Sequence, residues 1–256
     1  MSRGEVSVYI DDILIATDTE KRHYEELTEV LKALQNAHLR VKPQKCKLMG
    51  SKIAFLGHII DQKGVHTDPD KIEKIIQYPQ PKNLAELRAF LGLAGYYREF
   101  VFTFSHIAKP LCDITSTKIQ YRWGRDQEEP FNTLKTAIST APVLAQPDIE
   151  KARDGTRPFY LYTDATQDGV GVVLPQESDD GIIHPVYFTS KPLSKNERNC
   201  HITDQEALAL IDSLKKFHYF VYGVRTIVKT DNAPLTSLFK ERNVSPRVLR
   251  WALEVQ

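Results

Sequence analysis

Apolar and polar residues alternate near the start of the chain in a pattern typical of paired strands. Val6 and Val8 alternate with polar residues before two adjacent acids, Asp11 and Asp12, and an apolar run follows at 13–15. Two strand patterns separated by a short polar step predict a β-hairpin. The two acids are therefore expected at the hairpin turn or directly beside it.

Apolar residues at three- and four-residue spacing predict helices in the segments that follow. A capping-box pattern from Thr17 to Glu20 opens a helix expected to reach about His38. Asp68-Pro69 has the composition of a helix start, with the acid as cap and proline at the first position. A further helical piece is expected at 104–107, ended by Pro110. The helices after Asp68 are expected to form a small unit.

Three segments carry less regular patterns. The run 53–60 is expected as one strand, in which Gly57 marks a bulge or the close approach of another group. A short strand is expected at 121–123. The polar stretch 146–158, interrupted by proline and glycine, is expected to link two domains.

The C-terminal part has the clearest succession of strand and helix patterns. An apolar helix pattern around 207–214 lies between the third and fourth expected strands, and two helical stretches from about 234 and 245 follow. Pro175 is expected to end the second strand early. The strands are expected at 159–163, 169–174, 185–189 and 225–230. Strands, helix, strand and helices in this order predict an α/β layered fold.

Three acids occupy the ends of these elements. Asp164 follows the first strand, Glu206 lies in the first turn of the helix, and Asp231 follows the strand after it. Because sites in open α/β sheets gather at the carboxyl ends of strands, the three can converge. Each alone reads as a cap or a surface residue. As an ordered set they predict a site in which two Mg²⁺ ions activate water for attack on a phosphodiester.

Asp11 and Asp12 allow two interpretations. Adjacent carboxylates repel each other unless a cation neutralises them, and a hard divalent ion such as Mg²⁺ is the usual partner of clustered oxygen ligands. Asp residues are also common in solvated turns, so the pair alone does not decide between the two.

Charge is unevenly distributed in a chain whose formal net charge is only +1. The segment 30–60 has no Asp or Glu, and its six basic residues are Lys32, Arg40, Lys42, Lys45, Lys47 and Lys52. Such a strip suits a phosphate backbone, although a charge run is also a common solvated surface.

Composition sets the general class of the protein. The chain of 256 residues is 41% hydrophobic and 26% charged, which is ordinary for globular proteins. Its three cysteines are far apart, which argues against a disulfide framework or a zinc site and predicts a reducing, intracellular setting. No signal peptide is visible, and no apolar run reaches the roughly 18 residues of a membrane span. A protein that is neither secreted nor membrane-bound is expected.

Several short motifs resemble a known family in its own order. The chain is similar to the pol protein of gypsy-type long-terminal-repeat retrotransposons, and the C-terminal motifs look like its ribonuclease H (RNase H) domain. The first motifs are Tyr9-Ile10-Asp11-Asp12, Phe55-Leu56-Gly57-His58-Ile59, Leu91 to Arg98 and Ile107-Ala108-Lys109-Pro110-Leu111. The RNase H motifs are Tyr162-Thr163-Asp164-Ala165, Thr203 to Leu208 and Thr230-Asp231-Asn232.

The resemblance implies four regions within an overall α/β architecture. Residues 1–67 would be part of a reverse transcriptase palm, and 68–111 a thumb-like helical unit. Residues 112–157 would be a connection segment. Residues 158–256 would be an RNase H-like domain with a mixed sheet.

The resemblance also implies roles for particular residues. Asp11 and Asp12 would hold the metals of nucleotide addition, and Asp164, Glu206 and Asp231 those of RNA cleavage. The implied metal is Mg²⁺, with Mn²⁺ as the alternative. The residues implied to bind nucleic acid are Lys42, Lys45, Lys47, Leu56, Gly57 and His58.

The same resemblance implies partners and a location. The partners would be a primer–template duplex, an RNA–DNA hybrid and the remainder of the pol polyprotein, and no membrane is implied. The location would be a cytoplasmic particle or the nucleus. The sequence leaves the oligomeric state open.

Two features of the family pattern fall outside the chain. The family has a third palm aspartate upstream of the hairpin and a fourth RNase H acid beyond Gln256. The expectations are therefore no polymerisation, at best weak RNase H activity, and self-association through palm surface left exposed.

One alternative remains, and a second is disfavoured by the order of the acids. A degenerate or repurposed element would bind nucleic acid without cutting it. An integrase or transposase would place the helical Glu last among its acids, whereas here Glu206 precedes Asp231.

Overall fold

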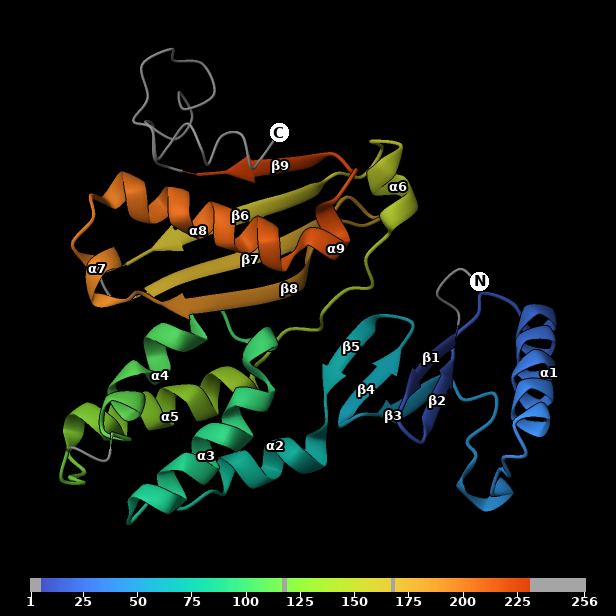
Figure 1. Cartoon of the computed structure of the whole chain (residues 1–256), viewed down its shortest axis with the longest axis horizontal. Helices are drawn as coiled ribbons and strands as arrows, with labels where there is room; N and C mark the ends of the chain where they lie inside the picture. Colours follow the sequence, from blue (N-terminus) through green and yellow to red (C-terminus); the bar gives the residue numbers. More distant parts are fainter. Residues whose placement is uncertain (1–5, 117–118, 167–168, 231–256) are drawn as a thin grey trace. The chain divides into compact units, whose positions relative to one another are not determined.

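The computed structural model describes residues 6–116, 119–166 and 169–230. The chain forms two compact units, Met1–Gln62 and Lys63–Gln256, and the boundary between them falls after strand β4 (Figure 1). Each unit has its own architecture.

The first unit consists of two hairpins and one long helix. Strands β1 and β2 pair antiparallel, and Tyr9 lies opposite Asp12. The two-residue turn is therefore Ile10-Asp11, as the alternation predicted. Helix α1 is capped by Thr19, whose side chain accepts from the Arg22 amide, instead of by Thr17. The elements are β1 Val6–Tyr9, β2 Asp12–Ile15, α1 Glu20–Asn36, η1 Pro43–Lys45, β3 Lys52–Phe55 and β4 His58–Asp61.

The expectation of one strand over 53–60 is wrong. Strands β3 and β4 pair antiparallel and Phe55 lies opposite His58, so Leu56 and Gly57 form a two-residue turn. Both have positive φ, 46° and 69°. A hairpin turn of this kind requires left-handed backbone at both positions, which explains the glycine. The apolar run concealed the turn because Leu56 is not a usual turn residue.

The described residues of the first unit have no hydrophobic core of their own. Between 6 and 62 only Glu26 is buried, and its carboxylate pairs with Arg22. Val8 is 66% exposed and Ile10 80%. Apolar strands whose side chains are at most partly buried are weakly held by this unit alone.

The second unit begins with a helical bundle built on one apolar cluster. Strand β5 forms a backbone bridge from Val65 to Leu144. Helix α2 is capped by Asp68 and helix α3 by Asn83, as the sequence predicted for the first of them. The elements are β5 Gly64–Thr67, α2 Pro69–Ile76, α3 Leu84–Tyr96, η2 Arg98–Phe100, α4 Phe104–Asp113 and α5 Arg125–Ser139. Fully buried members of the cluster are Ile75, Leu87, Phe90, Ala94, Tyr97, Leu111, Leu134 and Ile138.

Two sequence expectations fail in the bundle. Helix α4 continues through Pro110 to Asp113. A proline inside a helix costs about 3 kcal/mol, and the burial of Ala108 and Leu111 in the core offsets that cost. Residues 121–123 form no strand; their side chains pack on the bundle, where the Tyr121 hydroxyl donates to the Pro81 carbonyl and the Trp123 indole donates to Glu128.

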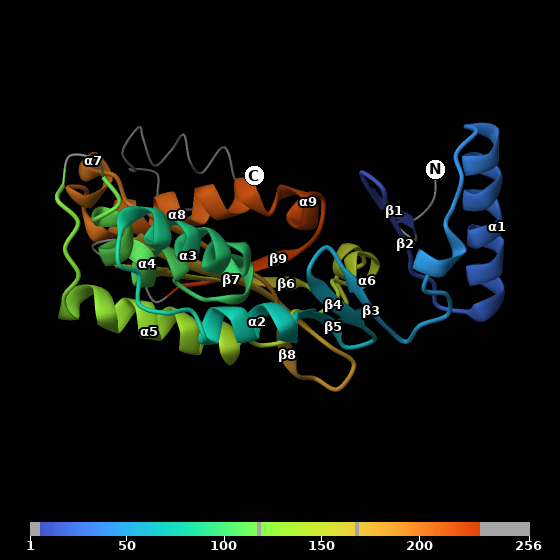
Figure 2. The ribbon, with the colours of Figure 1, turned by 90° about the horizontal axis from the view of Figure 1, so that it is seen from below.

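The second unit continues into a four-stranded mixed sheet with helix α8 packed against it (Figures 1 and 2). The strand order is β8-β7-β6-β9, in which β9 runs parallel to β6 and the other pairs are antiparallel. The elements are α6 Ile149–Arg153, β6 Phe159–Ala165, β7 Gly169–Glu177, β8 Ile183–Pro192, α7 Lys195–Arg198, α8 Ile202–Lys216, α9 His218–Val221 and β9 Thr226–Lys229. The α/β class with a mixed sheet is confirmed.

Pro175 does not end its strand, contrary to expectation. Strand β7 runs on to Glu177, and its pairing with β8 shifts register between Leu174 and Pro175. A bulge leaves one residue outside the regular ladder, so the missing amide of proline costs little there.

The stretch 146–158 is folded against the sheet. Helix α6 lies within it, and Ala152 is fully buried. The Gln176 side chain donates to the carbonyls of Asp148 at 2.9 Å and Arg157 at 3.0 Å. These contacts hold both ends of the stretch to β7. No helix among the described residues is long and apolar enough to cross a membrane.

The difference in burial predicts different local stability in the two units. Amides of β1 and β2 should exchange with solvent at least roughly tenfold faster than those of β6 and β7, because few buried contacts oppose local opening. Hydrogen exchange followed by mass spectrometry measures this. Equal protection in both sheets would contradict the account of a first unit without its own core.

Candidate active site

Of the three predicted C-terminal acids, Glu206 is held against the two residues that flank Asp164 at the end of strand β6. Glu206 lies in the second turn of α8 and is only 6% exposed. Its carboxylate accepts from the Thr163 hydroxyl at 3.2 Å and from the Ala165 amide at 3.2 Å. These donors are the two chain neighbours of Asp164, which is itself exposed. Helix α8 thus places the Glu206 carboxylate against the two residues that flank Asp164.

The third acid, Asp231, lies outside the described residues. The strand that precedes it, β9, runs parallel to β6, and Lys229 lies opposite Tyr162. The carboxyl ends of β6 and β9 therefore lie side by side, which is the arrangement expected for a site at the ends of parallel strands. No group of three or more His, Cys, Asp or Glu side chains that could hold a metal occurs among the described residues.

Gln205 positions the start of α8, a role that sequence reasoning missed. It is 4% exposed, and its amide donates to the carbonyls of Glu197 at 3.1 Å, Arg198 at 3.1 Å and Cys200 at 3.2 Å. It therefore adds a side-chain donor to carbonyls at and just after the end of α7, where few backbone amides are available. Its place inside the Thr203–Leu208 motif was the available signal.

Helix α7, which precedes α8, is held by a capping box. Ser194 and Glu197 exchange hydrogen bonds, and Lys191 pairs with Glu197 at 3.0 Å and with Asp212 at 2.7 Å. The hydrogen bonds from Ser194, with a smaller effect from Lys191, lower the pKa of Glu197 to about 2. The ion pair also connects β8 to α8.

The N-terminal acids lie at an exposed hairpin tip. Asp11 is in the turn, Asp12 begins β2, and both are exposed. Ile10 precedes them with φ of 51°, a conformation that is strained for a β-branched residue. Strained backbone conformations cluster at functional sites. Their free-energy cost is offset there by other contacts of the surrounding structure.

The predicted nucleic-acid-binding residues of the first unit fall into two structures. Lys42, Lys45 and Lys47 lie on or beside η1 in a fully exposed segment, 35–52. Leu56, Gly57 and His58 form the turn of the β3–β4 hairpin and the first residue of β4, and all three are partly buried. The basic strip is thus accessible to a polyanion.

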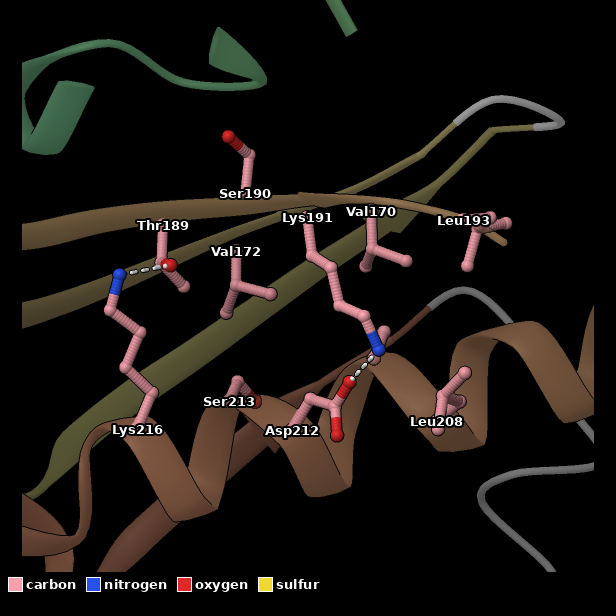
Figure 3. A pocket seen from close by; sticks show the side chains of 11 residues that line it. Val170, Val172, Thr189, Ser190, Lys191, Leu193, Leu208, Asp212, Ser213 and Lys216 are labelled. Carbon is pink, nitrogen blue, oxygen red and sulfur yellow. Dashed lines mark hydrogen bonds and ion pairs between the residues drawn. The ribbon is translucent and has the colours of Figure 1, made fainter. Parts of the chain in front are cut away.

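A cavity of about 280 Å³ lies between α8 and strands β7 and β8 (Figure 3). Val170, Val172 and Leu208 contribute apolar wall, while Lys216 donates to Thr189 across it. None of the predicted acids lines the cavity. An exposed Asp164 suits a substrate too large for an enclosed pocket, so we place the candidate site at the strand ends.

Two family models match the chain. Residues 3–60 match the reverse transcriptase (RNA-dependent DNA polymerase) family, and residues 154–256 match the RNase H-like domain found in reverse transcriptase. The sheet of β6 to β9 and the Asp164–Glu206 pair lie within the second match. The chain therefore carries a region of the reverse transcriptase family and an RNase H-like domain of the kind found in reverse transcriptases.

Curated relatives are Pol polyproteins of retrotransposons. The chain is 34% identical to the retrovirus-related Pol polyprotein from transposon opus of Drosophila melanogaster, over 97% of this chain and 25% of the relative. It is also 34% identical to the retrovirus-related Pol polyprotein from transposon gypsy of the same organism, over 95% of this chain and 24% of that relative. The Transposon Tf2-3 polyprotein of Schizosaccharomyces pombe is 33% identical, over 99% of this chain and 19% of that relative. The chain spans about a quarter of the length of the first of these.

Solved structures agree with the fold. The foamy viral protease-reverse transcriptase in complex with double-stranded DNA is 25% identical, with a TM-score of 0.78 over 98% of this chain and 52% of that one. The same viral protein in complex with an RNA/DNA hybrid is 24% identical, with a TM-score of 0.77 over 98% and 34%.

The low pKa of Glu197 predicts acid sensitivity at the start of α8. A carboxylate whose pKa falls from an ordinary 4.5 to about 2 on folding stabilises the fold above pH 4.5, and this is lost as the pH falls toward 2. Glu197→Gln should therefore lower the free energy of unfolding at pH 7 by more than at pH 3. Urea unfolding at both values measures it, and an equal effect at both would contradict the assignment.

Proposed function

We propose that the second unit cleaves the RNA strand of RNA–DNA hybrids, with Asp164, Glu206 and Asp231 as ligands of two divalent ions. The main support is that both chain neighbours of Asp164, Thr163 and Ala165, donate hydrogen bonds to the Glu206 carboxylate. A buried carboxylate is costly unless its oxygens are hydrogen-bonded, so this placement is unlike that of a surface glutamate. In this proposal 158–256 is the RNase H-like domain and 112–157 the connection segment.

The donor set fits a hard divalent cation. Asp164 and Glu206 offer carboxylate oxygens and no sulfur or imidazole, a set that favours Mg²⁺ or Mn²⁺. Such an ion would lower the pKa of bound water and stabilise the leaving oxygen of the phosphodiester. Asp164 and Glu206 would hold it together with Asp231.

The chain's own residues keep the Glu206 carboxylate in place. The Thr163 hydroxyl and the Ala165 amide orient both oxygens of Glu206, and Gln205 fixes the helix start from which Glu206 projects. These partners act as an outer layer around the acids, and such layers are worth roughly 10- to 100-fold in metal affinity or activity. Glu206 is therefore oriented before substrate arrives.

The first unit would contribute to the reverse transcriptase palm. In this proposal Asp11 and Asp12 hold metal for nucleotide addition, and residues 1–67 form part of the palm, followed by a thumb-like unit at 68–111. Support comes from the strained, exposed turn at Ile10 and from the left-handed turn at Leu56-Gly57. The exposed apolar strands would pack against other parts of the Pol polyprotein. The Pol polyprotein from transposon opus is about four times as long as this chain.

Nucleic acid would be held through its backbone. The strip at Lys42, Lys45 and Lys47 is exposed and suits phosphates. Similar solved proteins are complexes with an RNA/DNA hybrid and with double-stranded DNA. The proposed substrates are accordingly an RNA–DNA hybrid for cleavage and a primer–template duplex for the palm.

The nuclease proposal is tested on an RNA–DNA hybrid with labelled RNA in Mg²⁺ and then in Mn²⁺. Asp164→Asn and Glu206→Gln should each lower cleavage at least about 100-fold, because each removes a proposed metal ligand. Asp212→Asn is the matched control, since this acid is on the same helix and pairs with Lys191.

The outcomes separate the candidate functions. Full activity of Asp164→Asn would show that the proposed acids do not form the catalytic site. A wild-type chain that binds the hybrid but cuts nothing with either ion would favour a repurposed nucleic-acid-binding protein.

The binding surface gives a separate prediction. Replacing Lys42, Lys45 and Lys47 together with Ala should weaken hybrid binding and reduce the slope of log affinity against log salt by about 2 to 3, since each phosphate contact contributes about 0.9. Lys151→Ala is the control, because that lysine already pairs with Asp148 and Asp179. An unchanged salt slope, measured by fluorescence anisotropy, would show that the strip does not contact phosphates.

A further inference from the structure

Residues 98–113, which comprise η2 and α4, contact the edge strand of the sheet. The Ser105 amide donates to the Ser190 hydroxyl at 2.9 Å, and that hydroxyl donates to the Ser105 hydroxyl at 3.0 Å. Arg98 donates to the Ser190 carbonyl at 3.1 Å. Ser190 is only 7% exposed, so these groups are satisfied within the contact. The segment also contains the Ile107–Leu111 motif, which the proposed function leaves without a role.

Gly171 allows the segment to approach the sheet closely. A Cβ atom at this position would lie 2.5 Å from Cγ2 of Thr103 and 3.3 Å from the ring of Phe102. Thr103 has φ of 55°, which is unfavourable for a β-branched residue. Thr103, in a strained conformation, thus lies directly against the backbone of Gly171. The contact leaves no room for a side chain at position 171.

This contact lies on the face of the sheet that carries Asp164. Asp164, Gly171 and Ser190 are paired in one row across β6, β7 and β8. Directly opposite residues of antiparallel strands point to the same face, and successive residues point to opposite faces. Thr163 bonds Glu206 on the α8 side, so the Cα–Cβ bond of the next residue, Asp164, leaves the strand on the other face, in the row of Gly171 and Ser190.

Helix α4 also reaches the loop that follows Asp164. Nδ1 of His106 lies 3.4 Å from the hydroxyl of Thr166. On the α8 side, the Tyr187 hydroxyl donates to Glu99 of η2, and the Tyr187 ring lies 5.5 Å from that of Phe217. The segment 98–113 therefore contacts β8 on one face and, through Tyr187, is connected to the end of α8.

We infer that the segment 98–113 is a positioning element of the nuclease, and that the Thr103–Gly171 contact holds β6 and β7 where Asp164 must be for cleavage. This inference rests on the RNase H activity proposed above. Glu206 approaches Asp164's strand from α8 and the segment 98–113 lies on the opposite face. The nuclease then includes residues from the helical bundle, and Gly171 and Thr103 are positioning residues that touch no substrate.

The test introduces a side chain at the contact and then removes its obstacle. In the full chain, Gly171→Ala should lower kcat for hybrid cleavage by about 10- to 100-fold, because a displacement of about 1 Å can cost 100-fold. KM should stay within about twofold, since hybrid binding is not the altered step. Adding Thr103→Ser removes Cγ2 while keeping the hydroxyl that donates to the Phe102 carbonyl, and should restore most of kcat.

Two further measurements keep the result interpretable. Gly92→Ala is the matched glycine control, because a Cβ there meets nothing within 4 Å. Hydrogen exchange of the Ser105 amide, which donates to Ser190, reports the contact without nucleic acid. Its protection should fall in Gly171→Ala and return in the double variant. If Gly171→Ala does not fold, Ser190→Ala removes the acceptor of that amide and should also lower kcat without raising KM.

Each outcome supports or overturns the inference. Wild-type kcat in a folded Gly171→Ala chain overturns it, as does a loss of kcat that Thr103→Ser fails to restore while Ser105 protection returns. No cleavage by the wild-type chain overturns the proposed function instead, and the Ser105 amide then still shows whether the contact exists.

Discussion

The candidate site depends on one interaction, the hydrogen bonding of the buried Glu206 carboxylate by β6. Burying a carboxylate is unfavourable unless its oxygens find donors, and here the Thr163 hydroxyl and the Ala165 amide provide them. The pairing sets the register of α8 against the strand that carries Asp164. The packing of α8 on the sheet, the capping of α7 and the role of Gln205 all serve to bring this one side chain to that strand end.

The same dependence explains why the sheet needs support on its second face. Gly171 and Ser190 lie in the same row of the sheet as Asp164, and through them the sheet contacts the segment 98–113 on the face opposite α8. The first unit is organised differently. Its described residues bury no hydrophobic side chain, yet it has two tight turns with left-handed residues, at Ile10 and at Leu56-Gly57. Such turns present their neighbours at defined positions without requiring a large core.

The sequence was sufficient for what local pattern determines. Alternation placed Asp11 and Asp12 at a hairpin tip, and motif order placed Asp164 and Glu206 at a strand end and a helix start. It failed where tertiary contacts override local preference. Pro110 and Pro175 did not end their elements, because core burial and a bulge accommodate them. Leu56 concealed a turn, and Gly171 gave no local sign of the threonine that it faces across the fold. Asp231 lies outside the described residues, so its placement stays a prediction.

The most direct test of the central claim is whether a divalent ion binds beside Glu206. Addition of Mn²⁺ should broaden the NMR signal of the Ala165 amide, which donates to Glu206, through the paramagnetism of a nearby ion. The broadening should be lost in Asp164→Asn. If the Ala165 signal is unaffected in the wild-type chain, or is broadened equally in the variant, Asp164 and Glu206 do not form a metal site.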